Sequence, residues 1–169
     1  MKRLILAVAA LASTLALGAS AVNAQEIVRG GAPTSPIASV VTVPAGYDTI
    51  YVSGMTPPPL DPKGDPALTA TFGDTKTQTM GVLTRIQEAL KSQGATMGDV
   101  VMMRVLLVGD PAKGGAMDFA GMMESYNAVY QPLKNKPARI TSQVASLVRP
   151  GMLVEIEVQA AKKPGPMKK

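Results

Sequence analysis

The sequence contains no cysteine, no histidine and no tryptophan, and aromatic residues make up only 4% of its 169 residues. The lack of cysteine excludes a disulfide framework. Without histidine and cysteine the chain cannot form a Ser-His-Asp triad, a cysteine nucleophile or an ordinary zinc or copper site. Any chemistry must therefore depend on Arg, Lys, Asp, Glu, Ser, Thr, Tyr, backbone groups and water.

Positive charge is concentrated at the two ends of the chain. The formal net charge is +5, but Lys2 and Arg3 stand at the start and four lysines lie in residues 162–169. The body between them, residues 25–161, therefore has a formal charge of −1. Proteins that bind nucleic acids carry cations on a folded face together with stacking aromatics, so we expect no nucleic-acid partner. The basic end, 162–169, is predicted to be a disordered, solvated tail.

Residues 1–24 have the pattern of a cleavable signal peptide. Lys2 and Arg3 precede the apolar stretch 4–17, and Val22 and Ala24 stand where signal peptidase reads small residues. The stretch is shorter than the roughly 20 residues that span a bilayer. We expect cleavage after Ala24 and a periplasmic or secreted product with no membrane partner. The alternative is an uncleaved N-terminal anchor.

The remaining chain, 25–161, is predicted to be one α/β domain with the order β-β-α-β-α-β-β. Strands are expected where β-branched and apolar residues dominate, at 38–43, 49–53, 99–108, 138–147 and 152–160. The first two should form a hairpin, and the leader 25–36 should be a loop or a sheet edge. Apolar periodicity predicts helices from Asp74 to about Gln93, with Gly94 ending the first, and over 117–130. We expect one mixed sheet covered on one face by two helices.

Three local features could carry chemistry. Ser53-Gly54 ends a strand at a loop, Arg139 opens a strand, and Glu155 and Glu157 alternate along an apolar strand so that both face one side. Each also has a purely structural interpretation: a turn, a surface ion pair and a solvent-facing edge, respectively.

In their order and spacing these features resemble the RidA (YjgF) family of imine/enamine deaminases. The resemblance extends over essentially the whole mature chain. The motifs that carry it are Tyr51-Val52-Ser53-Gly54, Asp61-Pro62-Lys63-Gly64, Gln78, Gly94 to Val101, Asp118-Phe119, Pro137-Ala138-Arg139-Ile140-Thr141 and Leu153-Val154-Glu155-Ile156-Glu157. The last two of these motifs are the most specific.

The resemblance implies a chorismate-mutase-like α/β fold and a homotrimer whose active sites lie in the clefts between subunits. It implies that Arg139 grips the carboxylate of a 2-imino or 2-enamino acid, as a planar guanidinium can. Glu155 would position or activate the water that attacks the imine carbon, which releases ammonia and leaves a 2-oxo acid. No metal and no organic cofactor are implied.

Several positions depart from the family pattern. Ile37 stands where deaminating members carry a tyrosine, Met123 replaces an asparagine, and Met55 replaces a glutamine. Thr141 replaces a cysteine, and its backbone amide can still bind a ligand. The expected substrate-binding set is thus Arg139, Thr141, Ser53, Gly54, Ile37 and Met123.

Three functions remain open from the sequence. The first is 2-iminoacid deaminase activity through Arg139 and Glu155. The second is a non-catalytic trimer that binds a small carboxylate, which the lost tyrosine and asparagine favour. The third is endoribonuclease activity, a label that some family members carry; export and the near-neutral body argue against it.

Overall fold

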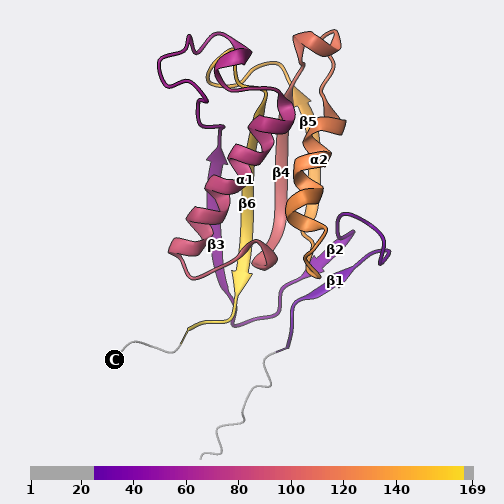
Figure 1. Cartoon of the computed structure of the whole chain (residues 1–169). Coiled ribbons are helices and arrows are strands. Elements are labelled where there is room, and N and C mark those ends of the chain that lie inside the picture. The colour runs from indigo at the N-terminus through magenta and orange to yellow at the C-terminus, as the bar shows by residue number, and fades with distance from the viewer. Residues whose placement is uncertain (1–24, 166–169) are drawn as a thin grey trace, which may run out of the picture.

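A computed structural model describes residues 25–165, so the predicted signal peptide and the last four residues lie outside the described range. Two α-helices and six strands make up the domain (Figure 1). Their bounds are β1 Val28–Gly30, β2 Val40–Thr42, β3 Asp48–Met55, α1 Thr75–Ser92, β4 Val100–Val108, α2 Phe119–Tyr130, β5 Ala138–Val144 and β6 Val154–Lys162. The last strand runs to the first residue of the predicted basic tail.

The central sheet is mixed, with the strand order β3-β6-β4-β5. Strands β4 and β5 are parallel, and the pairs β3–β6 and β4–β6 are antiparallel. Helix α2 forms the crossover that a parallel pair requires. Two helices packed on a mixed sheet confirm the predicted α/β class.

Helix α1 begins and ends where the sequence predicts. The Asp74 side chain accepts a hydrogen bond of 2.8 Å from the backbone N–H of Thr77, which satisfies one of the donors exposed at a helix start. At the other end Gly94 adopts a φ of +66°, a conformation that glycine tolerates best. Val82, Leu83, Ile86 and Leu90 form the buried face between these ends.

The predicted hairpin between 38–43 and 49–53 is wrong. Strand β2 pairs with β1, which forms in the leader, and β3 pairs with β6 from the far end of the chain. The two short strands form a small sheet of their own, joined to β5 by a bridge between Ala38 and Ala138. Pairing β3 with the apolar β6 buries Val52 in the core, which an isolated hairpin could not do.

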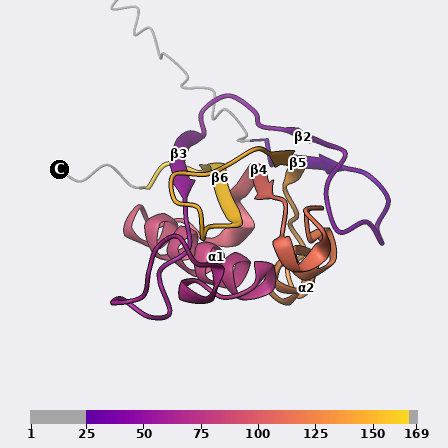
Figure 2. The same cartoon turned by 90° about the horizontal axis from the view of Figure 1, so that it is seen from above.

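Both helices cover the same face of the central sheet, as Figure 2 shows from above. Buried residues of β4 and β6 meet α1 and α2 on this face, including Met103, Val105 and Ile156. The opposite face is open in the single chain, with Tyr51 74% exposed and Ile140 48% exposed. None of the helices in the described part of the chain is long and apolar enough to cross a membrane.

A buried glutamine joins α1 to the turn that precedes β6. Gln78 is 0% exposed, and its Nε2 donates to the carbonyls of Gly73 and Gly151 at 2.8 and 3.1 Å. Its Oε1 accepts from the backbone N–H of Leu153 at 2.7 Å. The side chain thus satisfies three backbone groups that have no regular strand or helix partner, which places the start of β6.

We predict that Gln78→Leu lowers the free energy of unfolding by about 3 kcal/mol, because the substitution leaves buried backbone groups unpaired while nearly keeping the volume. Chemical denaturation of residues 25–169 measures this loss. The exposed Gln87 of the same helix provides the control, since Gln87→Leu should change stability by less than about 0.5 kcal/mol. Equal stabilities of the two variants would contradict the role given to Gln78.

Candidate functional site

Strand β5 presents Arg139 and Thr141 to the helical layer. Arg139 lies opposite Met103 of β4, and Thr141 lies opposite Val105. Met103 and Val105 are both 0% exposed in the core beneath the helices. Since residues paired across a sheet point to the same face, Arg139 and Thr141 also point toward the helices.

The Arg139 guanidinium is held by side chains of α2. Its Cζ lies 4.2 Å from the ring centroid of Tyr126 and 5.9 Å from that of Phe119. Its Nη2 donates to the Sδ of Met123 at 3.1 Å. An aromatic face attracts a guanidinium electrostatically, but a thioether is only a weak acceptor, so the cation is oriented without being neutralised.

Two buried polar atoms at this position have no hydrogen-bond partner among residues 25–165. They are Nη1 of Arg139 and Oγ1 of Thr141. Burial lowers the pKa of the Arg139 guanidinium below its ordinary value, while Tyr126 opposes the shift. The group is still a cation at neutral pH, and no carboxylate of the described residues forms an ion pair with it. A buried donor, a buried hydroxyl and an uncompensated charge suit a carboxylate ligand.

Tyr126 contacts Arg139 but is absent from the predicted binding set; the sequence placed it only within the predicted helix 117–130. Its hydroxyl donates to the carbonyl of Pro36 at 2.9 Å, and its ring stacks on Tyr130 with centroids 4.7 Å apart. Burial raises the pKa of Tyr126 to about 12, so the hydroxyl remains a donor at neutral pH. The spacing of Phe119, Met123 and Tyr126 was the available signal, because it places all three on one helix face.

Ile37 lies beside the start of β5. The next residue, Ala38, donates its backbone N–H to the carbonyl of Pro137 at 2.9 Å, and Ile37 itself packs against the core. Between this segment and α2 lies a cavity of about 440 Å³. Its lining includes Pro36, Met123, Tyr126, Asn127 and Lys136. Met123 and Tyr126, which contact Arg139, thus line this cavity together with Pro36, the neighbour of Ile37 in the chain.

Glu155 and Gly54 meet at a different place. A Cβ atom at Gly54 would overlap the Oε1 of Glu155, so only glycine leaves room for this carboxylate. Gly54 lies with the exposed Ser53 in an irregularity of the β3–β6 pairing, between Val52 and Met55. Met55 lies opposite Ile156 and packs against the core, so it does not line the surface beside Glu155.

The structure does not bring Arg139 and Glu155 together within one chain. Glu155 lies opposite Leu106 of β4, whereas Arg139 lies opposite Met103. These β4 positions are three apart, and side chains alternate along a strand, so the two residues point to opposite faces of the sheet. Glu157, paired with Arg104, shares the open face with Glu155, as the sequence analysis expected. A site that uses both Arg139 and Glu155 needs a second copy of the chain.

Comparison with known proteins places the chain in a family. The sequence profile of a family described as endoribonuclease L-PSP matches residues 32–162. A RutC family protein of Sulfurisphaera tokodaii is 33% identical over 132 residues, which cover 77% of this chain and 90% of that protein.

Solved structures agree with this assignment. The YjgF gene product of E. coli is 27% identical with a TM-score of 0.53, and E. coli TdcF with bound serine is 25% identical with a TM-score of 0.54. Each match covers 72% of this chain and 85% of the other. A conserved Rid family protein of Yersinia pestis, 24% identical with a TM-score of 0.58 over 81% of this chain and 98% of the other, has the same fold. The chain belongs to the YjgF/RidA family, whose profile is named endoribonuclease L-PSP.

Proposed function

We propose that this protein hydrolyses 2-imino acids, or the 2-enamino acids in equilibrium with them, to 2-oxo acids and ammonia. The observation that carries the proposal is the environment of Arg139. The guanidinium is partly desolvated, oriented by Tyr126 and Met123, and keeps one buried nitrogen without a partner among the described residues. A 2-imino acid supplies a carboxylate for this nitrogen directly beside its reactive carbon.

Binding would fix the substrate in one plane. One carboxylate oxygen accepts from Nη1 of Arg139 and the other from the hydroxyl of Thr141, the two groups that have no partner in the described structure. Both hydrogen bonds would gain from the low polarity created by Phe119, Met123 and Tyr126 around Arg139. Orientation of this kind lowers the barrier of a reaction that already proceeds slowly in water.

Glu155 of a neighbouring copy would handle the protons. Its carboxylate takes a proton from water while the water oxygen forms a bond to the imine carbon, and it passes this proton to the imine nitrogen, which becomes an amine. Glu155 then takes the proton of the new hydroxyl and delivers it to that nitrogen as the C–N bond breaks and the carbonyl forms, which releases ammonia and leaves the 2-oxo acid. One water is consumed and the carboxylate is regenerated.

We propose a homotrimer in which these sites form between copies. The open sheet face carries Glu155 and exposed apolar side chains such as Ile140, and a single chain leaves it uncovered. The fold neighbour TdcF was solved with serine, a small amino acid that has the carboxylate required here. We further propose that residues 1–24 direct export, so that the reaction takes place outside the cytoplasm.

A second candidate function is carboxylate binding without turnover. The groups that would hold the carboxylate come from one chain, whereas hydrolysis also needs Glu155 from another. Binding therefore demands less of the assembly than catalysis does. We do not assign RNA cleavage, because the body 25–161 has a formal charge of −1 and lacks the cationic face that RNA binding requires.

We predict that Arg139→Ala lowers kcat/KM for a 2-imino acid roughly 100-fold or more, since the charge-assisted hydrogen bond from Nη1 and the positive charge beside the carboxylate are both lost. An amino-acid oxidase generates the imino acid, and semicarbazide traps what is not hydrolysed. Arg139→Lys should also be impaired, because an ammonium cannot reproduce the planar geometry. Arg149→Ala, at an exposed loop arginine, is the matched control and should retain activity.

Equal suppression of trapping by wild type and Arg139→Ala would contradict the deaminase proposal. If the wild type does not accelerate hydrolysis, thermal shift with a 2-oxo acid decides the second candidate. Stabilisation that is lost in Arg139→Ala would support binding without turnover.

The sharing of the site between copies has its own prediction. Arg139→Ala and Glu155→Gln should each be inactive. Refolding the two variants together at equal amounts should restore about a quarter of wild-type activity, because one interface in four then combines an intact Arg139 with an intact Glu155. A mixture that stays inactive would contradict a shared site.

A matched control separates the two arrangements quantitatively. Wild type refolded with the Arg139→Ala/Glu155→Gln double variant should give about a quarter of full activity for a shared site, and about half for a site within one chain.

A further inference from the structure

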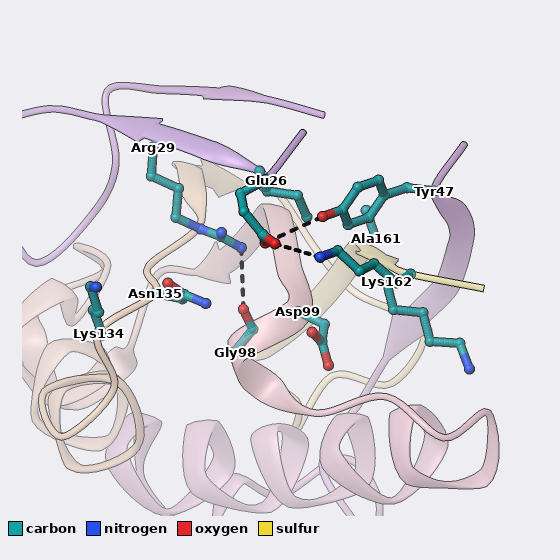
Figure 3. Close-up of a pocket in the computed structure, with 11 residues that line it drawn as sticks. Glu26, Arg29, Tyr47, Gly98, Asp99, Lys134, Asn135, Ala161 and Lys162 are labelled. Carbon is teal, nitrogen blue, oxygen red and sulfur yellow. Dashed lines mark hydrogen bonds and ion pairs between the residues drawn. The ribbon is translucent and has the colours of Figure 1, made fainter. Parts of the chain in front are cut away.

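A second cavity lies at the end of the sheet where β6 ends and β4 begins. Its volume is about 660 Å³, within the range of small-molecule sites. The walls come from the segment around β1, the turn before β4, the loop after α2 and the end of β6. Figure 3 shows the charged side chains that line it, among them Glu26, Arg29, Asp99, Lys134 and Lys162; Glu26 and Arg29 lie near each other, whereas Asp99 and Lys162 extend away from them.

The charges of this cavity are unbalanced. Its lining carries four cations, Arg29, Lys134, Lys162 and Lys163, against the two carboxylates of Glu26 and Asp99. The body 25–161 contributes Arg29 and Lys134 against Glu26 and Asp99, which balance, and the excess comes from Lys162 and Lys163 of the basic end. The fold thus brings the start of the basic end beside cations from two other segments.

Both carboxylates are already engaged. Asp99 Oδ2 accepts from the backbone N–H and the hydroxyl of Thr96, at 2.7 and 2.8 Å. Glu26 pairs with Lys163 and lies 3.5 Å from the hydroxyl of Tyr47. Among residues 25–165, no ion pair involves Arg29, Lys134 or Lys162.

Arg29 is fixed in place by backbone carbonyls. Its Nε donates to Lys136 and its Nη2 to Gly98 and Val100, all at 3.2 Å. Figure 3 shows the bond to Gly98. Burial lowers the pKa of this guanidinium, and the negative charge of Asp99 only partly offsets the effect. The contacts hold Arg29 rigid, and its Nη1 makes no hydrogen bond to the described residues.

The other two cations come from unrelated parts of the chain. Lys162 ends β6 and donates to the carbonyl of Gln93 at 2.7 Å, which leaves two of its three N–H donors for other partners. Lys134 follows α2 and is exposed, and neither it nor Asn135 has a side-chain hydrogen bond to any of residues 25–165. Arg29 has a structural role, because it joins β1 to the neighbouring segments. That role does not explain why Lys134, Asn135 and Lys162 line the same cavity.

We propose that this cavity binds a small organic anion that carries two or more carboxylate or phosphate groups. A single acidic group can neutralise one cation, whereas a ligand with several can join Arg29, Lys134 and Lys162 from three segments. The amide of Asn135 adds a donor for the same oxygens. Arg139, Thr141, Met123 and Tyr126 are not among the residues that line this cavity, so it is distinct from the Arg139 site. The proposal goes beyond the proposed deaminase function.

Calorimetric titration of residues 25–169 at constant ionic strength tests the proposal, with citrate as the carboxylate probe and inorganic pyrophosphate as the phosphate probe. At least one of the two should bind, and the stronger binder identifies the preferred acidic group. Lys134→Glu should weaken this binding about 10-fold or more, because it reverses one of three attracting charges. Lys113→Glu, at an exposed lysine outside the cavity, should change it by less than about twofold.

Further variants and one further probe distinguish binding in this cavity from competing explanations. Arg139→Ala should bind the probe as well as the wild type does, and loss of binding in that variant alone would assign the anion to the other site. No binding of either probe, or equal weakening by Lys113→Glu and Lys134→Glu, would overturn the proposal. Tighter binding of a short RNA oligonucleotide that displaces the probe would replace it with a polymer site. Lys162→Gln, if Lys134→Glu fails to fold, should likewise weaken binding several-fold.

Discussion

The candidate site depends on one interaction: a partly buried guanidinium that lies on an aromatic ring without a carboxylate partner. Arg139 lies 4.2 Å from the centroid of Tyr126, and Met123 orients it from the same helix. Moving a cation out of water is costly unless other groups compensate, and a ring face and a thioether do so only in part. The arrangement therefore keeps an affinity for anions that a salt bridge within the chain would remove. Tyr126 also donates a hydrogen bond to the carbonyl of Pro36, and so links the surroundings of Arg139 to the segment that holds Ile37.

The sheet imposes the second constraint. Side-chain alternation places Arg139 beneath the helices and Glu155 on the open face, and no rotamer change can move either group through the sheet. Gly54 leaves room for the Glu155 carboxylate, which therefore lies on the surface where another copy could pack. Catalysis would thus depend on assembly. The basic cavity, which lies where β6 ends and β4 begins, uses groups from one chain and has no such requirement.

Local features could be predicted from the sequence, and pairings between distant segments could not. Asp74, Gly94 and the apolar spacing between them define α1 because capping and periodicity are properties of neighbouring residues. The hairpin prediction failed because the partner of β3, strand β6, lies more than a hundred residues away. The turn residues between β2 and β3 do not show that β6 pairs with β3 in place of β2. Family resemblance identified Arg139 and Glu155. Their opposite orientation follows only from the register of β5, β4 and β6, and the contact with Tyr126 only from how α2 packs on β5.

The most direct test of the central claim is a crystal structure of residues 25–169 soaked with 2-oxobutanoate, a product-like acid. We expect carboxylate oxygens within about 3 Å of Arg139 Nη1 and Thr141 Oγ1. We also expect Glu155 of a neighbouring copy to face the C2 carbon. A crystal in which the acid leaves Arg139 without a ligand, or in which no neighbouring Glu155 approaches the bound acid, would contradict this claim.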